Sequence, residues 1–254
     1  MNRVAMFNVL KRDADMQAQV RALLVANCVQ CASGGYLDED LSSNNQFILG
    51  YLAFVLNHHT HLPRLVPLVQ SIASIPKGNY VAEGNYLNRL TELMAIRFVS
   101  TILKHNLVEL EAVSPHRSAN TPKTCDIKTK NPDGIETYFE TKDESSVIIS
   151  QKEEPKDPRF SCISPKLAKA LENWINGRVN DCIQKGANYL VARAIAWQVN
   201  GALKFTTDWV DAVFPNNSQI DHITFKVALK SQPPDWFKGI YIVSPDDQYL
   251  LLIP

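Results

Sequence analysis

Two carboxylates and a lysine in the stretch CDIKTKNPDGIETYFETKD, residues 125–143, have types and spacing that suit a divalent cation. Asp126 precedes a turn signal, and Glu140 and Lys142 follow it, two residues apart. Carboxylate oxygens are the ligands that Mg²⁺ and Mn²⁺ prefer. A lysine beside them could orient or deprotonate an attacking water and neutralise charge that develops on a phosphate. The stretch therefore indicates metal-assisted hydrolysis, provided that the three side chains converge.

The turn between the two carboxylates predicts how they are placed. In NPDG, Pro132 suits the first corner of a type I turn, Asp133 the second, and Gly134 the left-handed position that follows. This combination is typical of a three-residue hairpin loop with a bulge. In the register that it sets, Asp126 lies opposite Glu140, with Cβ atoms about 5 Å apart.

Alternation along the two strands predicts a core face and a charged face. The residues expected in the core are Ile127, Ile135 and Phe139, and those expected on the other face are Asp126, Lys128, Glu136, Tyr138, Glu140 and Lys142. Two carboxylates directly across a ladder repel each other, and a bound divalent cation removes that cost. The alternative is an exposed hairpin with ordinary surface charges and a Lys–Glu ladder.

The elements around the hairpin predict an α/β domain with a mixed sheet. Helical periodicity runs over residues 83–105, and an alternating strand follows at 107–113. After the hairpin, a second helix is expected from the cap Ser164 with Pro165 at its first position, and residues 188–197 read as a central strand. The order is therefore helix, three strands, helix and strand, with further strands towards residue 254.

This arrangement resembles the PD-(D/E)XK nuclease superfamily, which has the restriction-endonuclease-like fold, over approximately residues 80–200. The resemblance implies that Asp126 and Glu140 ligate Mg²⁺ or Mn²⁺. It also implies that Thr141 offers its carbonyl to the metal and that Lys142 assists the attacking water.

The first core helix of this superfamily often contributes another acid, and the resemblance points to Glu92, with Glu83 as the alternative. The sequence departs from the motif because Cys125, not proline, precedes Asp126. A literal Pro-Asp does occur at Asp133, seven residues before Glu140. At about 3.3 Å per residue that separation is on the order of 20 Å, too far to share a metal. Asp126 is therefore the expected ligand.

The predicted organisation is a helical N-terminal region, residues 1–78, and a nuclease domain with C-terminal strands, residues 79–254. The predicted function is a metal-dependent nuclease that hydrolyses phosphodiester bonds in nucleic acid, with DNA as the expected substrate. The alternative is a non-catalytic module on the same fold that binds nucleic acid or protein. The N-terminal helices would serve substrate choice, homodimerisation or docking of a protein partner.

Local charge indicates where nucleic acid would bind. The whole chain is balanced, with 26 Lys plus Arg against 26 Asp plus Glu, so an anionic partner needs a local basic surface. Residues 155–204 carry such an excess, and the expected contacts are Lys166, Lys169, Arg178 and Lys185. Gln184 and Lys185, late in the expected second helix, could also give polar support to the site. A solvated helix face would produce the same pattern.

The remaining features predict a reduced, cytoplasmic protein. No signal peptide or membrane-length apolar run is visible, and the five cysteines do not suggest a disulfide framework. A zinc-dependent regulator could use the pair Cys28 and Cys31 with His58, His59 and His61. However, the 26 residues between Cys31 and His58 match no standard zinc spacing.

Overall fold

Two compact units make up the chain, Met1–Thr101 and Ile102–Pro254, and each is described by itself. The structure is a computed structural model and describes residues 14–119, 122–143, 176–193, 195–199, 202–207, 210–215, 222–226, 232–243 and 249–253. The division falls after Thr101 and not after residue 78, because the long helix that follows residue 79 belongs to the first unit.

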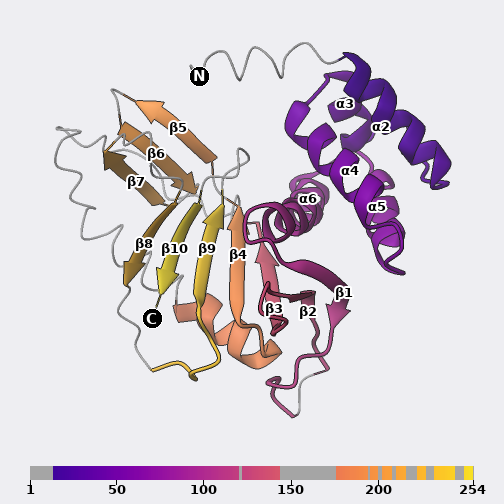
Figure 1. Ribbon diagram of the computed structural model, residues 1–254. Helices are drawn as coiled ribbons and strands as arrows, with labels where there is room; N and C mark the ends of the chain where they lie inside the picture. Colours follow the sequence, from indigo (N-terminus) through magenta and orange to yellow (C-terminus); the bar gives the residue numbers. More distant parts are fainter. Residues whose placement is uncertain are drawn as a thin grey trace. The chain divides into compact units, whose positions relative to one another are not determined.

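The first unit is helical, as the sequence predicts. Its described helices are α2 (Ala14–Ala26), α3 (Tyr36–Ser42), α4 (Gln46–His58), α5 (Leu65–Ala73) and α6 (Tyr80–Thr101) (Figure 1). α4 packs against α2 and α6, and α6 also contacts α5. The side chains of Leu52, Leu93 and Phe98 are fully buried in this unit. This packing explains why α6 joins the N-terminal helices in one compact unit.

The second unit contains an open, mixed sheet (Figure 1). Its described strands lie in the order β1 (Asn106–Ala112), β2 (Cys125–Lys130), β3 (Glu136–Lys142), β4 (Tyr189–Arg193), β9 (Gly239–Val243), β10 (Tyr249–Ile253) and β8 (His222–Lys226). β1, β2 and β3 are antiparallel neighbours, whereas β3 and β9 both run parallel to β4. β10 is antiparallel to β9 and parallel to β8.

The chain order of the described elements agrees with the expected one. α6, β1, β2 and β3 are followed by a helix over residues 176–185 and then by β4. The predicted cap Ser164 and first helical residue Pro165 lie outside the described residues. The chain therefore has a mixed α/β architecture, with β4 between β3 and β9 in the sheet.

The prediction of one strand over residues 188–197 is wrong. The run divides into β4, which lies inside the large sheet, and β5 (Ile195–Val199), which belongs to a second sheet with β6 (Ala202–Thr207) and β7 (Val210–Pro215). β4 ends at Arg193, whose Nε donates to Asp143 Oδ1 at 2.6 Å. A continuous apolar run marks both pieces as strand, but it cannot show that the chain leaves one sheet for another.

The hairpin between β2 and β3 has the predicted loop and register. Gly134 has a φ of 79°, and its N–H donates to the carbonyl of Asn131 at 2.9 Å. Asn131 donates its own N–H to the carbonyl of Ile135 at 3.0 Å. The ladder pairs Ile127 with Phe139, Lys128 with Tyr138, Thr129 with Thr137 and Lys130 with Glu136.

The two faces of the hairpin differ from the prediction at two places. Ile127 and Phe139 are fully buried, as expected, but Ile135 is 61% exposed because it lies in the loop before β3 begins. The charged face is solvated only near the loop, where Glu136 pairs with Lys128 at 2.9 Å. Farther along β3, Glu140 is only 1% exposed. The alternative of an exposed charged hairpin therefore holds for Glu136 and fails for Glu140.

Gly186 follows the helix 176–185, and its substitution tests whether the close approach of the Arg117 backbone requires a glycine at this position. Its φ is 77°, and a Cβ there would lie 2.4 Å from the backbone nitrogen of Arg117. We expect Gly186→Ala to lower the free energy of unfolding by about 3 kcal/mol, because left-handed strain of about 1 kcal/mol adds to overpacking of about 2 kcal/mol. Chemical denaturation measures this change.

Gly134→Ala is the matched control for that test. Gly134 has a similar φ of 79°, but nothing lies within 4 Å of the Cβ position. The control should therefore lose only the strain, about 1 kcal/mol. Equal losses in the two variants would show that the close approach of the Arg117 backbone is not a constraint.

Candidate active site

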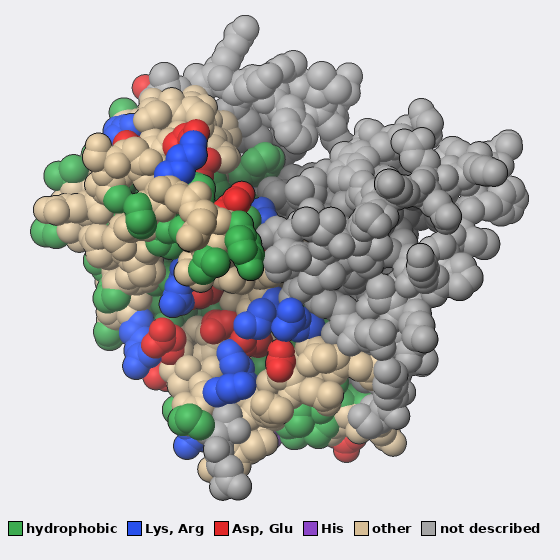
Figure 2. Space-filling model, turned by 180° about the vertical axis from the view of Figure 1, so that it is seen from behind, with side chains coloured by type: hydrophobic (Ala, Val, Ile, Leu, Met, Phe, Trp, Pro, Cys, Tyr) green, Lys and Arg blue, Asp and Glu red, His purple; other side chains and the backbone are tan. Residues whose placement is uncertain are grey.

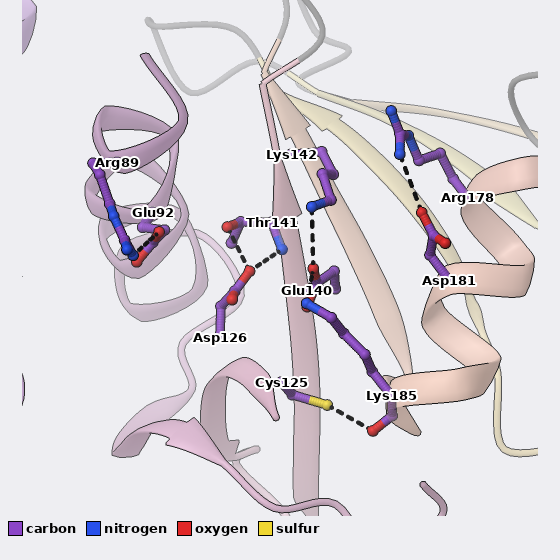
Figure 3. Close-up of polar contacts among 10 residues, drawn as sticks. All are labelled: Arg89, Glu92, Cys125, Asp126, Glu140, Thr141, Lys142, Arg178, Asp181 and Lys185. Carbon is purple, nitrogen blue, oxygen red and sulfur yellow. Dashed lines mark hydrogen bonds and ion pairs between the residues drawn. The ribbon is translucent and has the colours of Figure 1, made fainter. Parts of the chain in front are cut away.

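Glu140 on β3 is the centre of the site. Its carboxylate is buried, and its Oε1 accepts a hydrogen bond from Lys185 Nζ and lies 3.6 Å from Lys142 Nζ (Figure 3). Its Oε2 is also buried and has no hydrogen-bond partner among the described residues. The side chain thus has one oxygen facing two ammonium groups and one that is unsatisfied.

The surroundings of Glu140 and Lys185 raise the pKa values of both side chains. Burial, and after it the nearby charge of Asp126, raises the pKa of Glu140, while Lys185 and Lys142 lower it, and together these effects bring the pKa to about 7. Burial lowers the pKa of Lys185, but the carboxylates of Glu140 and Asp126 outweigh burial, so the pKa lies above its ordinary value. Lys185 therefore stays charged and compensates Glu140.

Asp126 on β2 is held from the side of β3. Its Oδ2 accepts two hydrogen bonds from Thr141, one from the backbone N–H and one from Oγ1, each 2.7 Å long (Figure 3). The ladder between β2 and β3 ends at the pair Ile127 and Phe139, one step before Asp126 and Glu140. Beyond the end of the ladder, the carboxylate of Asp126 accepts the backbone N–H of Thr141 on β3.

The end of the helix 176–185 brings Lys185 to Glu140. The carbonyl of Lys185 accepts a hydrogen bond from Cys125 Sγ at 3.3 Å, and the carbonyl of Gln184 accepts one from the Ser118 N–H at 3.1 Å. Gly186 and Ala187 close the helix with N–H bonds to Ile183 and Cys182, an arrangement typical of a glycine cap. The helix end is therefore anchored to β2 and to the segment after β1.

The cysteines near the site are structural. Cys125 and Cys182 are fully buried, as expected for core positions. Burial, together with the charges of Glu140 and Asp126, raises the pKa of Cys125 to about 12. Burial likewise raises the pKa of Cys182 well above its ordinary value. Neither thiol is poised to form the thiolate that a nucleophile requires.

The structure brings together part of the predicted set of site residues. Asp126, Glu140, Thr141 and Lys142 form one cluster, as the hairpin register predicts. Lys185, predicted as a contact for nucleic acid, lies within this cluster on Glu140 and is 18% exposed. The signal for this role was weak, because a lysine late in a helix gives no indication of which strand it reaches.

The other predicted residues belong to the first unit, to the helix 176–185 or to the part of the chain outside the described residues. Glu92 is on α6 in the first unit, where its Oε1 pairs with Arg89 Nη1 at 2.7 Å (Figure 3). Glu83 lies in the first turn of that helix. Since the two units are described separately, the role of Glu92 as a ligand stays a prediction. Arg178 pairs with Asp181 on its own helix at 3.1 Å. Lys166 and Lys169 lie outside the described residues.

A small cation fits the donor atoms of the cluster. Mg²⁺ commonly binds through one or two carboxylates and keeps several waters, which matches Asp126 and Glu140 with the carbonyl of Thr141 as a further donor. The buried, unpartnered Oε2 of Glu140 is the atom that most needs such a partner. Within the described part of the chain, no group of three or more His, Cys, Asp and Glu side chains is arranged to hold a metal.

In the described part of the chain, Cys28, Cys31 and the histidines at 58, 59 and 61 form no group of three or more that could hold a metal ion. Cys28 follows the end of α2, with a φ of 58° and an exposed side chain. The ring centroids of His59 and His61 are 6.2 Å apart. Burial lowers the pKa of His59, and the neighbouring His61 lowers it further.

The charged side chains of the described part are mixed on the face drawn in Figure 2. There, Lys and Arg side chains alternate with Asp and Glu and do not form a continuous basic area. Four of the eight Lys and Arg residues in the segment 155–204 lie outside the described residues, namely Lys156, Arg159, Lys166 and Lys169. No helix of the described residues is long and apolar enough to cross a membrane.

Comparison of the chain with protein-family models, with curated proteins and with solved structures gives no significant match. The functional argument therefore depends on the residues of the site and on the order of the elements that position them.

Lys185 and Lys142 differ in a way that stability measurements can test. Lys185→Met leaves the buried Glu140 carboxylate without its nearest cation, so at pH 8 without metal we expect a loss of about 3 kcal/mol in the free energy of unfolding. Lys142 is 33% exposed and 3.6 Å away, and Lys142→Met should cost less than about 1 kcal/mol. Denaturant titration of both variants makes the comparison, and equal losses would contradict this assignment.

Proposed function

We propose that the protein is a metal-dependent nuclease of the PD-(D/E)XK kind, which hydrolyses phosphodiester bonds in nucleic acid and acts as a DNA endonuclease. The observation that carries the proposal is the buried Glu140, with one oxygen on Lys185 and the other unpartnered, beside Asp126. Burying such charges costs several kcal/mol, and perturbed, buried titratable groups gather at functional sites.

The fold gives independent support for this proposal. The order α6, β1, β2, β3, helix 176–185 and β4, with an antiparallel hairpin followed by a parallel strand, agrees with the core expected of a restriction-endonuclease-like domain. The hairpin register brings the acid of β2 to the Glu-x-Lys segment of β3. The literal Pro-Asp lies at the exposed loop, so Asp133 is not part of this site.

Asp126 and Glu140 would hold Mg²⁺ or Mn²⁺, with the Thr141 carbonyl as a further donor, and Glu92 of the first unit stays a predicted additional ligand. When bound, the metal polarises a phosphoryl oxygen and lowers the pKa of a water ligand. Lys142 has a partly exposed ammonium group beside Glu140, where it can position the attacking water and stabilise charge on the phosphate. Lys185 compensates the charge of Glu140 from the interior.

Paired substitutions test the assignment of the two carboxylates. We expect Asp126→Asn and Glu140→Gln each to reduce Mg²⁺- or Mn²⁺-dependent cleavage of plasmid DNA by about 100-fold or more, because each loses charge at the metal. Asp133→Asn and Glu136→Gln are the matched controls, since both residues belong to the same hairpin and are exposed. Gel assays of cleavage rates measure the effect.

The outcome of these assays separates the proposal from its alternative. An Asp126→Asn variant that cleaves DNA at the wild-type rate would contradict the assignment of Asp126 to the metal site. A wild type that cleaves neither DNA nor RNA with either metal would favour the alternative, a non-catalytic module that binds nucleic acid or protein. Docking or homodimerisation through the first unit is compatible with both functions.

Nucleic-acid binding is expected to depend on Lys166 and Lys169, which the sequence predicts in the second helix. The double variant Lys166→Ala/Lys169→Ala should bind DNA more weakly and lower the slope of log K against log salt by about 2, because each phosphate contact releases about one counterion. Lys77→Ala is the control, because Lys77 is exposed and pairs with Glu39 in the first unit. Fluorescence anisotropy at several salt concentrations measures both slopes, and an unchanged slope in the double variant would exclude these contacts.

A further inference from the structure

The two carboxylates of the site share one property that their positions in the sequence do not show. In each, the described residues engage one oxygen and leave the other without a hydrogen bond. Glu140 receives Lys185 on Oε1 and has a buried, unpartnered Oε2. Asp126 receives both donors of Thr141 on Oδ2, and no described residue donates to its Oδ1.

Thr141 holds Asp126 with two donors on a single oxygen. Its backbone N–H and its Oγ1 both lie 2.7 Å from Oδ2, and its side chain is 5% exposed (Figure 3). Two hydrogen bonds to one oxygen fix the rotation of the carboxylate plane, which a single bond would leave free to turn. The second oxygen of Asp126 is then the one that remains for another partner.

We propose that Thr141 is a positioning residue, whose hydroxyl turns Asp126 so that Oδ1 alone faces the cation. This inference rests on the proposed function, because it assumes that a metal binds between Asp126 and Glu140. A cation that takes one oxygen from each carboxylate and completes its octahedron with water matches the behaviour of Mg²⁺ and Mn²⁺. Hydrogen bonds from outside the ligand set orient metal ligands in this way, and their loss typically costs 10- to 100-fold in affinity.

The role differs from the one that the family resemblance implies for this position. A carbonyl of Thr141 that binds the metal would need no hydroxyl, so valine, alanine or serine would serve equally well. A hydroxyl that holds Asp126 can be replaced only by serine. The side chain at position 141 thus distinguishes the two roles.

Mn²⁺ affinity, measured by isothermal titration calorimetry on the full chain without nucleic acid, tests the inference. Thr141→Val keeps the shape and the backbone N–H but removes the hydroxyl, and we expect Mn²⁺ to bind about 10-fold more weakly. Thr141→Ser restores the donor and should bind within about twofold of the wild type. Thr137→Val is the matched control, because Thr137 is a buried threonine on the same strand that makes no contact with Asp126.

If the Thr141 hydroxyl only stabilised the fold, Thr141→Val would lower the thermal midpoint, but the folded protein would bind Mn²⁺ as tightly as the wild type and Thr141→Ser. The thermal midpoint of each variant is therefore measured beside its Mn²⁺ affinity. A folded Thr141→Val protein with wild-type affinity would overturn the inference and leave the nuclease proposal intact. Equal loss in the serine and valine variants would also overturn it, because the hydroxyl would then not be the cause. A wild type that binds no Mn²⁺ and cleaves no nucleic acid would remove the proposed function itself.

Discussion

The second unit is organised around the burial of the Glu140 carboxylate. Removing a carboxylate from water costs several kcal/mol unless a cation and hydrogen bonds replace the solvent. Lys185 is that cation, and it reaches Glu140 only because the helix 176–185 ends beside β3. The left-handed Gly186 and the close approach of the Arg117 backbone fix where this helix ends. The electrostatic pair therefore depends on a backbone constraint.

The hairpin loop sets a second constraint. Gly134 closes a three-residue loop, and the register that follows brings Asp126 to the backbone and hydroxyl of Thr141. A shift of one residue would exchange the two faces of β3 and turn Glu140 away from Lys185. The loop sets the register of β3, and that register determines which face of the strand Glu140 occupies. Lys185 can therefore pair with Glu140 only in this register.

The strongest signals in the sequence came from the turn residues. Turn residues act through their own backbone angles, so NPDG predicted the loop and the ladder of β2 and β3. Periodicity predicted α6 and the strands of the sheet. It failed at Ile135, which is exposed in the loop, and at residues 188–197, which divide between two sheets. Alternation reports that a residue is extended, but not which neighbour it meets.

The sequence by itself determined the hairpin, the order of helices and strands, and the pairing of Asp126 with the Glu-x-Lys segment, because these depend on interactions between near neighbours. Only the tertiary structure decided that Glu140 is buried and that Lys185, 45 residues away, is the cation on it. It also decided that Thr141 engages one oxygen of Asp126. Burial and long-range pairing arise from the packing of elements distant in the chain, and residue types alone do not specify that packing.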